Sequence, residues 1–311
     1  MNNYILLTGG NGYIGYNLYK QLSNLYNIII FDSTDGNNLL NVNSISNIFE
    51  KYKIDLVIHL AGFKCVPDSI IEPLDYYSNN IIGTINLLNV MKIYKCNNII
   101  FSSSASVYGN IISPIKEKDI ILCNQTNPYA RTKLYIENIL NDLYISDNKW
   151  NIIILRYFNP VGGYNYIDIN NISNPNFFIN ILKCIKNNET LNIFGNDYHT
   201  RDGTCIRDFI HIRDLIEAHI SSIEFIINNN FPIKIYNIGT GKGYTLLEIV
   251  NNFNTQLLSM NKDIINYKYC PKRIGDIDIN YSDCSLIKKE LGWEAKYNLD
   301  DMISNSVVTI I

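Results

Sequence analysis

A glycine-rich turn near the start of the chain constrains the fold more than any other feature of the sequence. It reads Thr8-Gly9-Gly10-Asn11-Gly12-Tyr13-Ile14-Gly15 and joins a short apolar stretch to a segment with helical periodicity. Glycines at this spacing permit a tight strand-to-helix turn, let backbone N–H groups approach a pyrophosphate, and allow the helix to pack closely on the strand. The turn favours a dinucleotide-binding βα unit, and a βα corner without a ligand is the alternative.

Short apolar stretches alternate with longer helical patterns over the first half of the chain. We expect strands at Tyr4–Thr8, Ile28–Asp32, Asp55–Leu60, Asn98–Ser103 and Asn151–Tyr157. Each stretch is nearly apolar throughout, which is typical of parallel strands that helices cover on both faces. The alternation therefore predicts an α/β fold with a doubly wound parallel (Rossmann-type) sheet.

The regular alternation ends after Tyr157, where Gly162-Gly163 and an Asn-rich stretch follow. We expect a domain boundary at about residue 160. The segment Ile206–Ile227, a strand and then a helix, and the strand Ile233–Asn237 are interpreted as returns to the first domain. The predicted domains are a dinucleotide-binding domain, 1–160 with 206–238, and a smaller C-terminal α/β substrate domain, 161–205 with 239–311.

The composition and charge of the chain limit the kinds of partner that it can bind. The formal net charge is −3 with 18% charged residues, which argues against a basic surface for nucleic acid or anionic lipid. No apolar run approaches the length of a membrane-spanning helix, and the N-terminus lacks the basic region of a signal peptide. The seven cysteines never form a Cys-x-x-Cys pair, so we expect reduced thiols, no metal site and a cytoplasmic protein.

Asp32 ends the second predicted strand, roughly 20 residues after the middle glycine of the turn. A carboxylate at this point can hydrogen-bond the ribose hydroxyls of an adenosine and repel a 2′-phosphate. Asp32 therefore favours NAD over NADP as the cofactor.

A second group of polar residues consists of Ser102-Ser103-Ser104 at a strand end and Tyr129 with Lys133 at a helix start. Tyr129 and Lys133 are four residues apart and share one helical face. A nearby ammonium favours the phenolate, so we expect Lys133 to lower the pKa of Tyr129 and make it a general base. Tyr16 and Lys20 have the same spacing, but we interpret them as solvated surface, because only the first pair follows a strand end of the parallel sheet.

Further segments carry a family resemblance: Arg156-Tyr157-Phe158-Asn159-Pro160-Val161-Gly162, Ile193–Tyr198 and Thr200–His211. Together with the glycine turn and the Ser104, Tyr129 and Lys133 set, they resemble the extended short-chain dehydrogenase/reductase family. The element Asp-Gly-Thr-x-x-Arg-Asp-aromatic-Ile-His, which begins at Asp202, narrows the resemblance to the UDP-glucose/UDP-galactose 4-epimerases. The similarity extends from the first strand to Trp293.

This resemblance implies NAD-dependent epimerisation at C4 of a UDP-hexose through a transient 4-keto sugar. Tyr129 would act as the base on the sugar 4-hydroxyl, Ser104 would hydrogen-bond that hydroxyl, and Lys133 would hold the nicotinamide ribose. The implied cofactor contacts are Gly9, Gly12, Tyr13, Ile14, Gly15, Asp32, Asn41, Val42, Leu60, Ala61, Gly62, Lys64, Asn79, Ser102, Tyr129, Lys133 and Tyr157. The implied substrate contacts are Ser104, Tyr129, Asn159, Asn174, Asn176, Phe177, Phe194, Arg207, Arg273, Asp276 and Asn280. We also expect a homodimer.

The chain departs from the family pattern at three places. The segment between Asp32 and the next helix is short, so we expect the strand that family members have there to be vestigial. In the same segment Leu40-Asn41-Val42 replaces the Gly-Asp-Ile whose Asp contacts adenine in the family. The loop after Val161 is short, which leaves open whether Asn174 or Asn176 meets UDP. Asn280 stands where some members have a bulky Tyr that lines the sugar, so we expect room for a 2-acetamido group.

Three other functions are compatible with the fold, and the residues at 105 and 106 argue against the first of them. A 4,6-dehydratase would carry an Asp-Glu pair where Ala105 and Ser106 stand, and elimination of water needs such groups. A UDP-glucuronate epimerase should offer an additional cation for the C6 carboxylate. A non-catalytic NAD sensor is compatible with the fold, but such proteins typically lose the tyrosine or lysine that this chain retains.

Overall fold

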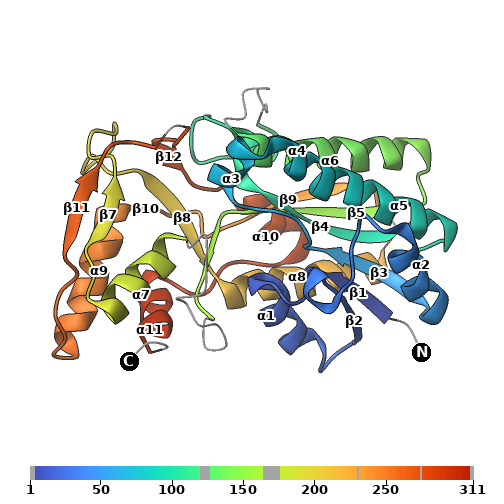
Figure 1. Cartoon of the computed structure of the whole chain (residues 1–311), viewed down its shortest axis with the longest axis horizontal. Helices are drawn as coiled ribbons and strands as arrows, with labels where there is room; N and C mark the ends of the chain where they lie inside the picture. Colours follow the sequence, from blue (N-terminus) through green and yellow to red (C-terminus); the bar gives the residue numbers. More distant parts are fainter. Residues whose placement is uncertain (1–3, 120–126, 164–175, 230, 274, 309–311) are drawn as a thin grey trace.

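The larger sheet of the protein has six strands in the order β2-β1-β3-β4-β5-β9 (Figure 1). The structure is a computed structural model that describes residues 4–119, 127–163, 176–229, 231–273 and 275–308. Every neighbouring pair in this sheet is parallel. The strands are β1 (Tyr4–Thr8), β2 (Asn27–Phe31), β3 (Ile54–His59), β4 (Asn98–Ser104), β5 (Asn151–Tyr157) and β9 (Lys234–Ile238). The prediction of a doubly wound parallel sheet is confirmed.

Helices cover both faces of this sheet (Figure 1), so its inner strands are buried on both sides, while the edge strand β2 is partly buried. One face packs against α1 (Tyr13–Leu22), α8 (Ile212–Asn228) and α10 (Ser285–Leu291). The other packs against α2 (Val42–Lys51), α5 (Gly83–Ile93) and α6 (Pro128–Ser146). Burial on two sides explains why each strand is an apolar run rather than an alternating pattern.

Short helical segments connect these elements. They are η1 (Ser33–Asp35), α3 (Val66–Ile71), α4 (Pro73–Tyr76), the π-helix η2 (Tyr77–Ile82) and η3 (Ala105–Tyr108). The chain passes from β2 through η1 directly into α2, and within the described residues no strand pairs with the outer edge of β2. The reduction of structure expected after Asp32 therefore leaves β2 at the edge of the sheet.

The smaller part of the molecule is built around β8 (Ile206–His211). This strand pairs with β6 (Asn159–Val161) and β12 (Ile279–Asn280) in parallel and with β10 (Gly243–Thr245) antiparallel. A separate parallel pair is formed by β7 (Leu191–Phe194) and β11 (Tyr267–Cys270). The helices of this part are α7 (Phe177–Asn187), α9 (Leu246–Ser259) and α11 (Leu299–Val307).

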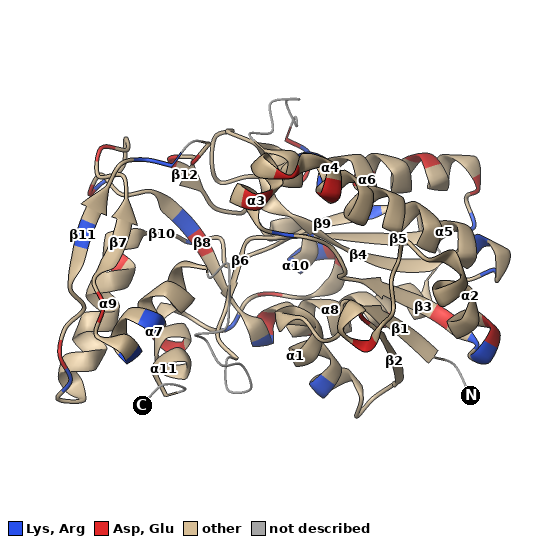
Figure 2. Ribbon diagram, viewed as in Figure 1, with Lys and Arg blue, Asp and Glu red and all other residues tan. Residues whose placement is uncertain are grey.

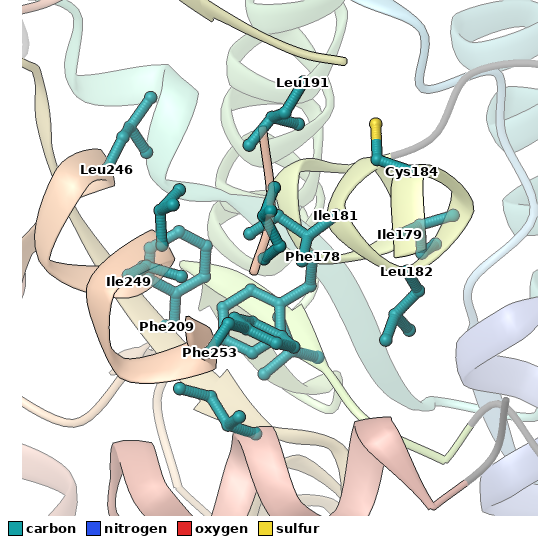
Figure 3. Packing of buried hydrophobic residues seen from close by; sticks show 14 of the residues in the cluster. Phe178, Ile179, Ile181, Leu182, Cys184, Leu191, Phe209, Leu246, Ile249 and Phe253 are labelled. Atoms are coloured by element: carbon teal, nitrogen blue, oxygen red, sulfur yellow. The ribbon is translucent and has the colours of Figure 1, made fainter. Parts of the chain in front are cut away.

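This smaller part has a hydrophobic core of its own (Figure 3). The ring of Phe178 on α7 lies between those of Phe209 on β8 and Phe253 on α9, at centroid distances of 5.1 and 5.2 Å. Phe178 and Phe253 have no solvent exposure. Aromatic pairs of this kind bury large areas and fix the strand and the two helices relative to one another.

We expected residues 206–238 to return to the larger domain, and the structure shows this for α8 and β9 only. β8 lies in the smaller sheet, because its hydrogen-bonding partners β6, β10 and β12 are all outside the six-stranded sheet. Figure 2 shows Lys and Arg interspersed with Asp and Glu over both parts of the molecule. None of the helices in the described residues is long and apolar enough to cross a bilayer.

Candidate functional site

A cavity of about 810 Å³ lies at the carboxyl ends of the strands of the large sheet. Doubly wound sheets bind their ligands at this edge. The cavity gathers many of the residues expected from the sequence: Gly9, Gly12, Tyr13, Ile14, Gly15, Asp32, Leu60, Ala61, Gly62, Lys64, Asn79, Ser102, Ser104, Tyr129, Lys133, Tyr157, Asn159, Asn176 and Arg273. Their position along one continuous cavity makes a joint cofactor and substrate site geometrically feasible.

The glycine turn forms one wall of this cavity. Gly9 has a φ of +72°, a conformation that favours glycine, and an added Cβ would lie 2.8 Å from the backbone nitrogen of Ala61. A Cβ on Gly15 would lie 2.2 Å from the carbonyl oxygen of Gly9. The N-terminus of α1 has no side-chain cap, and the start of a helix attracts an anion through its first N–H groups and its dipole. These features fit the pyrophosphate of a dinucleotide.

Asp32 is buried at the end of β2, where its carboxylate also organises the neighbouring loops. One oxygen accepts from the backbone N–H of Asn11 at 3.0 Å, and the other accepts from the N–H and hydroxyl of Thr34 at 3.0 and 2.9 Å. The carboxylate thus holds the glycine turn against η1 while it lines the cavity. This placement suits a contact with the ribose of an adenosine.

Two of the expected cofactor residues lie outside the cavity lining. Asn41 is exposed and caps α2, its side chain accepting from the N–H groups of Asn43 and Ser44, and Val42 is exposed in the first turn of that helix. Asn37, Asn38 and Leu39 line the cavity instead. The side chain of Asn41, which the family resemblance assigns to the cofactor, is therefore used to cap α2.

The start of α6 positions Tyr129. Asn127 caps the helix by accepting from the N–H of Ala130 at 2.9 Å, and Pro128 occupies the first turn, where its missing N–H costs nothing. Tyr129 is hydrogen-bonded to Ser104 at the end of β4. The hydroxyl of Ser104 also accepts from the N–H and the hydroxyl of Ser106 at 3.2 and 2.9 Å. Two elements distant in sequence thus meet at one pair of hydroxyls.

Lys133 is buried one turn after Tyr129 on α6. Its ammonium donates to the carbonyl oxygen of Ser102 at 2.6 Å and lies 4.8 Å from the ring centroid of Phe101. Burial lowers the pKa of Lys133 to about 8, against the opposing effect of the Glu137 carboxylate. The lysine is therefore anchored to β4, and its pKa lies closer to neutral pH than that of an exposed lysine.

The structure does not bear out the expectation that Lys133 lowers the pKa of Tyr129. Burial raises the pKa of Tyr129, and the hydrogen bond with Ser104 acts in the opposite direction. Helical spacing places the two side chains on one face, but the ammonium turns toward Ser102 and is held there. The side chain that opposes the effect of burial on the phenol is therefore Ser104, which we expected to bond the sugar hydroxyl, and not Lys133.

A buried histidine and a buried amide bond together the strands and helices that carry the site. His59 bonds Thr8 at 2.7 Å and Thr84 at 2.8 Å, and burial lowers its pKa to about 3. Asn80, which we did not single out from the sequence, donates to Thr132 at 3.1 Å. The sequence feature that could have indicated Asn80 is its position next to Asn79, in a helical segment that packs against α6. Among the described residues, no group of three or more His, Cys, Asp or Glu side chains is placed to hold a metal ion.

Residues expected for UDP lie toward the smaller part. Arg273 lines the cavity, contacts the ring face of Phe194 at 4.8 Å and pairs with Asp276 at 3.1 Å. Asn280 on β12 pairs in register with Arg207 on β8, so the two side chains stand on the same face of that sheet. Phe194, Arg207, Asp276 and Asn280 do not line the cavity themselves.

The start of α7 carries Asn176, one of the two asparagines that the sequence offers as a contact for UDP. Asn176 lines the cavity, caps α7 by accepting from the N–H of Ile179 at 2.9 Å, and donates to the carbonyl of Pro160 at 3.0 Å. Phe177 packs against the core of the smaller part. Asn174 lies outside the described residues. Of the two asparagines, the structure describes Asn176 alone, and Asn176 lies at the cavity.

The fold and this site define a dinucleotide-binding α/β protein with a Tyr-x-x-x-Lys pair at the cofactor cavity. Residues 5–239 match the family model of the NAD dependent epimerase/dehydratase family. The chain belongs to this family.

Relatives resemble the chain over nearly its whole length. It is 39% identical to a UDP-glucose 4-epimerase of Bacillus subtilis (strain 168), covering 97% of this chain and 95% of that protein. It is 40% identical to a UDP-glucose 4-epimerase of Dictyostelium discoideum, covering 96% and 93%. A crystal structure of the Bifidobacterium longum UDP-glucose 4-epimerase with NAD+ and UDP superposes with a TM-score of 0.86 at 34% identity, covering 98% and 97%.

Proposed function

We propose that this protein is an NAD-dependent isomerase that epimerises C4 of a UDP-hexose and interconverts UDP-glucose and UDP-galactose. The observation that carries the proposal is the meeting of Ser104, Tyr129 and Lys133 in the cavity that begins at the glycine turn. Nearly full-length similarity to UDP-glucose 4-epimerases supports the same reaction.

The residues of the large sheet hold the cofactor in this proposal. The glycine turn and the N-terminus of α1 receive the pyrophosphate, Asp32 receives the adenosine ribose, and Lys133 receives the nicotinamide ribose. When bound, NAD supplies hydride acceptance and return at C4, which take the sugar through a transient 4-keto form.

Tyr129 and Ser104 handle the proton of the sugar 4-hydroxyl. Tyr129 removes this proton as a general base and gives it back when the hydroxyl re-forms. The hydrogen bond from Ser104 stabilises the phenolate and opposes the effect of burial on the pKa of Tyr129. Both residues are fixed by regular elements, β4 and α6, so little reorganisation is needed during the reaction.

The UDP moiety lies toward the smaller part. Arg207 and Arg273 supply two cations for the diphosphate, and arginine is well suited to paired contacts with phosphate oxygens. Asn159 and Asn176 supply amides at the cavity, and Phe194 and Asp276 complete the set through their contacts with Arg273. Phosphate binding therefore depends on a few placed groups in a chain whose net charge is −3.

One experiment tests the function directly. The purified protein is incubated separately with UDP-glucose, UDP-N-acetylglucosamine and UDP-glucuronate, and the products are resolved. We expect UDP-galactose from UDP-glucose and no product from UDP-glucuronate. Conversion of the uronate alone would favour the uronate epimerase, and bound NAD without turnover of any of the three would favour a non-catalytic sensor.

The cofactor preference gives the first mutational prediction. Asp32→Ala should weaken NAD binding about 10- to 100-fold, because a charge-assisted hydrogen bond to the ribose is lost. It should also bind NADP better than the wild type does, since the carboxylate no longer repels a 2′-phosphate. Titration of both cofactors into the stripped protein measures the two effects. Asp35→Ala is the matched control, because Asp35 is exposed nearby. Wild-type protein that is more active with NADP would contradict the assignment.

Sugar choice gives the second prediction. Asn280 is 8% exposed and stands beside Arg207, and it lacks the bulk of the Tyr found here in some family members. We expect the wild type to interconvert UDP-N-acetylglucosamine and UDP-N-acetylgalactosamine as well as the plain hexoses. Asn280→Tyr should abolish the acetylated reaction and spare the other, because overfilling a packed site costs about 1–3 kcal/mol or more. Comparison of kcat/KM for both substrates in both proteins measures this effect.

Asn280→Gln is the matched control, since it keeps the amide and adds little volume. Wild-type turnover confined to UDP-glucose and UDP-galactose would contradict the prediction. The shortened loop after Val161 would then be the element that closes the pocket.

The remaining proposals concern assembly and place. We propose a cytoplasmic homodimer without nucleic acid or membrane partners. Large apolar side chains exposed along α4, η2, α5 and α6 support a protein partner on that side: Leu74, Ile82, Ile85, Ile93 and Tyr135. We also propose that the large sheet forms the NAD domain and the smaller part the UDP-sugar domain, each with its own hydrophobic core.

A further inference from the structure

The serines at the end of β4 meet α6 at three successive turns. Tyr129 is hydrogen-bonded to Ser104, Lys133 donates to the carbonyl of Ser102, and Glu137 accepts from the hydroxyl of Ser103. Tyr129, Lys133 and Glu137 are each four residues apart, so they form one stripe on the helix. The third of these contacts belongs to a residue that has no part in the proposed chemistry.

Glu137 is a buried carboxylate held by a buried arginine. The side chain of Glu137 is 5% exposed and that of Arg156 on β5 is 3% exposed. Arg156 Nη2 donates to Glu137 Oε2 at 2.6 Å, and Arg156 Nε donates to Oε1 at 3.1 Å. This two-point contact fixes the carboxylate more firmly than a single bond. Ser103 and Arg156 are register partners on adjacent strands, so one pair joins helix and sheet behind the active site.

Arg156 is itself held in place on its other side. Its guanidinium lies 4.6 Å from the ring centroid of Tyr108, and Nη1 donates to the carbonyl of Glu117 at 3.3 Å. Tyr108 ends η3, the segment that follows Ser104 directly. The Glu137–Arg156 pair therefore contacts the chain on both sides of Ser104, at Ser103 through Glu137 and at Tyr108 through Arg156.

We infer that Glu137, fixed by Arg156, is a positioning residue that sets the place of Ser104 against Tyr129 and retains the proton on Lys133. This inference rests on the proposed function of Ser104, Tyr129 and Lys133. Deletion of an anion behind a buried ammonium favours loss of its proton, and deletion of the arginine exposes the ammonium to an unneutralised carboxylate. Loss of Glu137 should therefore lower the pKa of Lys133, and loss of Arg156 should raise it.

Few other groups around this cluster titrate at neutral to alkaline pH. Lys133 faces His59 from β3, whose pKa burial lowers to about 3, so His59 stays neutral. Burial raises the pKa of Tyr157 on β5, and also that of Tyr108 beside Arg156. Burial raises the pKa of Glu117 as well. Burial also lowers the pKa of Lys64, which lines the same cavity but, within the described residues, bonds neither Glu137 nor Arg156. Lys133, with a pKa of about 8, and Tyr129 are therefore the groups whose titration should respond to substitution of Glu137 or Arg156.

The test compares the pH dependence of kcat in wild type, Glu137→Gln and Arg156→Met, each carrying NAD. In Glu137→Gln the alkaline loss of activity should occur about one pH unit lower, because Lys133 releases its proton more easily. In Arg156→Met it should occur at higher pH. Both variants should lose about tenfold or more in kcat through misplacement of Ser104. Lower kcat with an unmoved alkaline limb in both variants would show a merely structural pair and overturn the inference.

Two further variants separate charge from position. Glu137→Asp keeps the charge on a shorter side chain, so kcat should fall while the alkaline limb stays in place. A limb displaced as far as in Glu137→Gln would overturn the charge role. Glu290→Gln is the matched control: Glu290 accepts from Lys234 and from Tyr236, both at 2.8 Å, but it lies on α10. This variant should keep the wild-type profile.

A readout without turnover keeps this inference distinct from the proposed function. The tyrosinate absorbance of NAD-loaded protein is followed against pH, with Tyr129→Phe subtracted to isolate Tyr129. Glu137→Gln should lower the pKa of Tyr129 and Arg156→Met should raise it, since the first removes a negative charge and the second a positive one. These shifts can occur even if no UDP-hexose is turned over, which would contradict the function alone. An identical Tyr129 titration in all three proteins would overturn the inference.

Discussion

Tyr129→Phe should lose about 10²–10⁴-fold in kcat while it keeps both NAD and UDP. The substitution removes the hydroxyl that takes the proton of the sugar, but it keeps the aromatic ring in the first turn of α6. Lys133 remains bonded to Ser102, so the cofactor side of the cavity is unchanged. Progress curves with UDP-glucose give the rate, and calorimetric titration of UDP into the NAD-loaded variant shows that binding is retained.

Tyr16→Phe is the internal control for this experiment. Tyr16 lies on α1 with Lys20 four residues on, and the ammonium of Lys20 lies 5.6 Å from its ring. The pair thus repeats the Tyr-x-x-x-Lys spacing away from the cavity lining. Tyr16→Phe should be nearly silent. Comparable losses from both substitutions would show that the tyrosine at 129 acts through general stability and would refute its role as the base.

Local pattern predicted most of the large sheet because its inner strands are buried on two sides and are therefore continuous apolar runs. The runs Tyr4–Thr8 and Asn151–Tyr157 coincide with β1 and β5, and the others differ by one residue at their ends. β8 was assigned to the wrong sheet, because an apolar run shows that a strand is buried but not which strands it will pair with. Pairing partners such as β6 and β12 are too short to leave a clear periodic signal.

The candidate site was predictable where chemistry depends on spacing within one element. Tyr129 and Lys133 share a helical face, and the same rule extended by one more turn would have indicated Glu137. Ionisation was not predictable in this way, because the pKa of Tyr129 depends on burial and on where the ammonium of Lys133 turns. Asn41 shows the same limit, since capping of α2 uses its amide.

The glycine turn gives the second large prediction. Gly15→Ala should yield a protein that purifies without NAD and binds added NAD more than tenfold less tightly. An added Cβ would lie 2.2 Å from the carbonyl oxygen of Gly9 and 2.7 Å from Cα of Gly10, and both are backbone atoms that cannot rotate away. The first turn of α1 must therefore move away from the strand end, and it takes with it the N–H groups that face the pyrophosphate. The NAD content of the purified protein measures the effect.

Thermal unfolding separates loss of the cofactor site from loss of the fold. Overpacking of this kind costs about 1–3 kcal/mol, so Gly15→Ala should have a lower Tm than the wild type. Excess NAD should raise the Tm of the wild type, since a ligand that binds only the native state stabilises it, but should raise that of Gly15→Ala by clearly less, because its affinity for NAD is lower. Gly36→Asn is the matched control, because nothing lies within 4 Å of an added Cβ there and asparagine tolerates the φ of +80°. An NAD-dependent rise in Tm for Gly15→Ala equal to that of the wild type would show that close packing of α1 on the strand is not what forms the cofactor site.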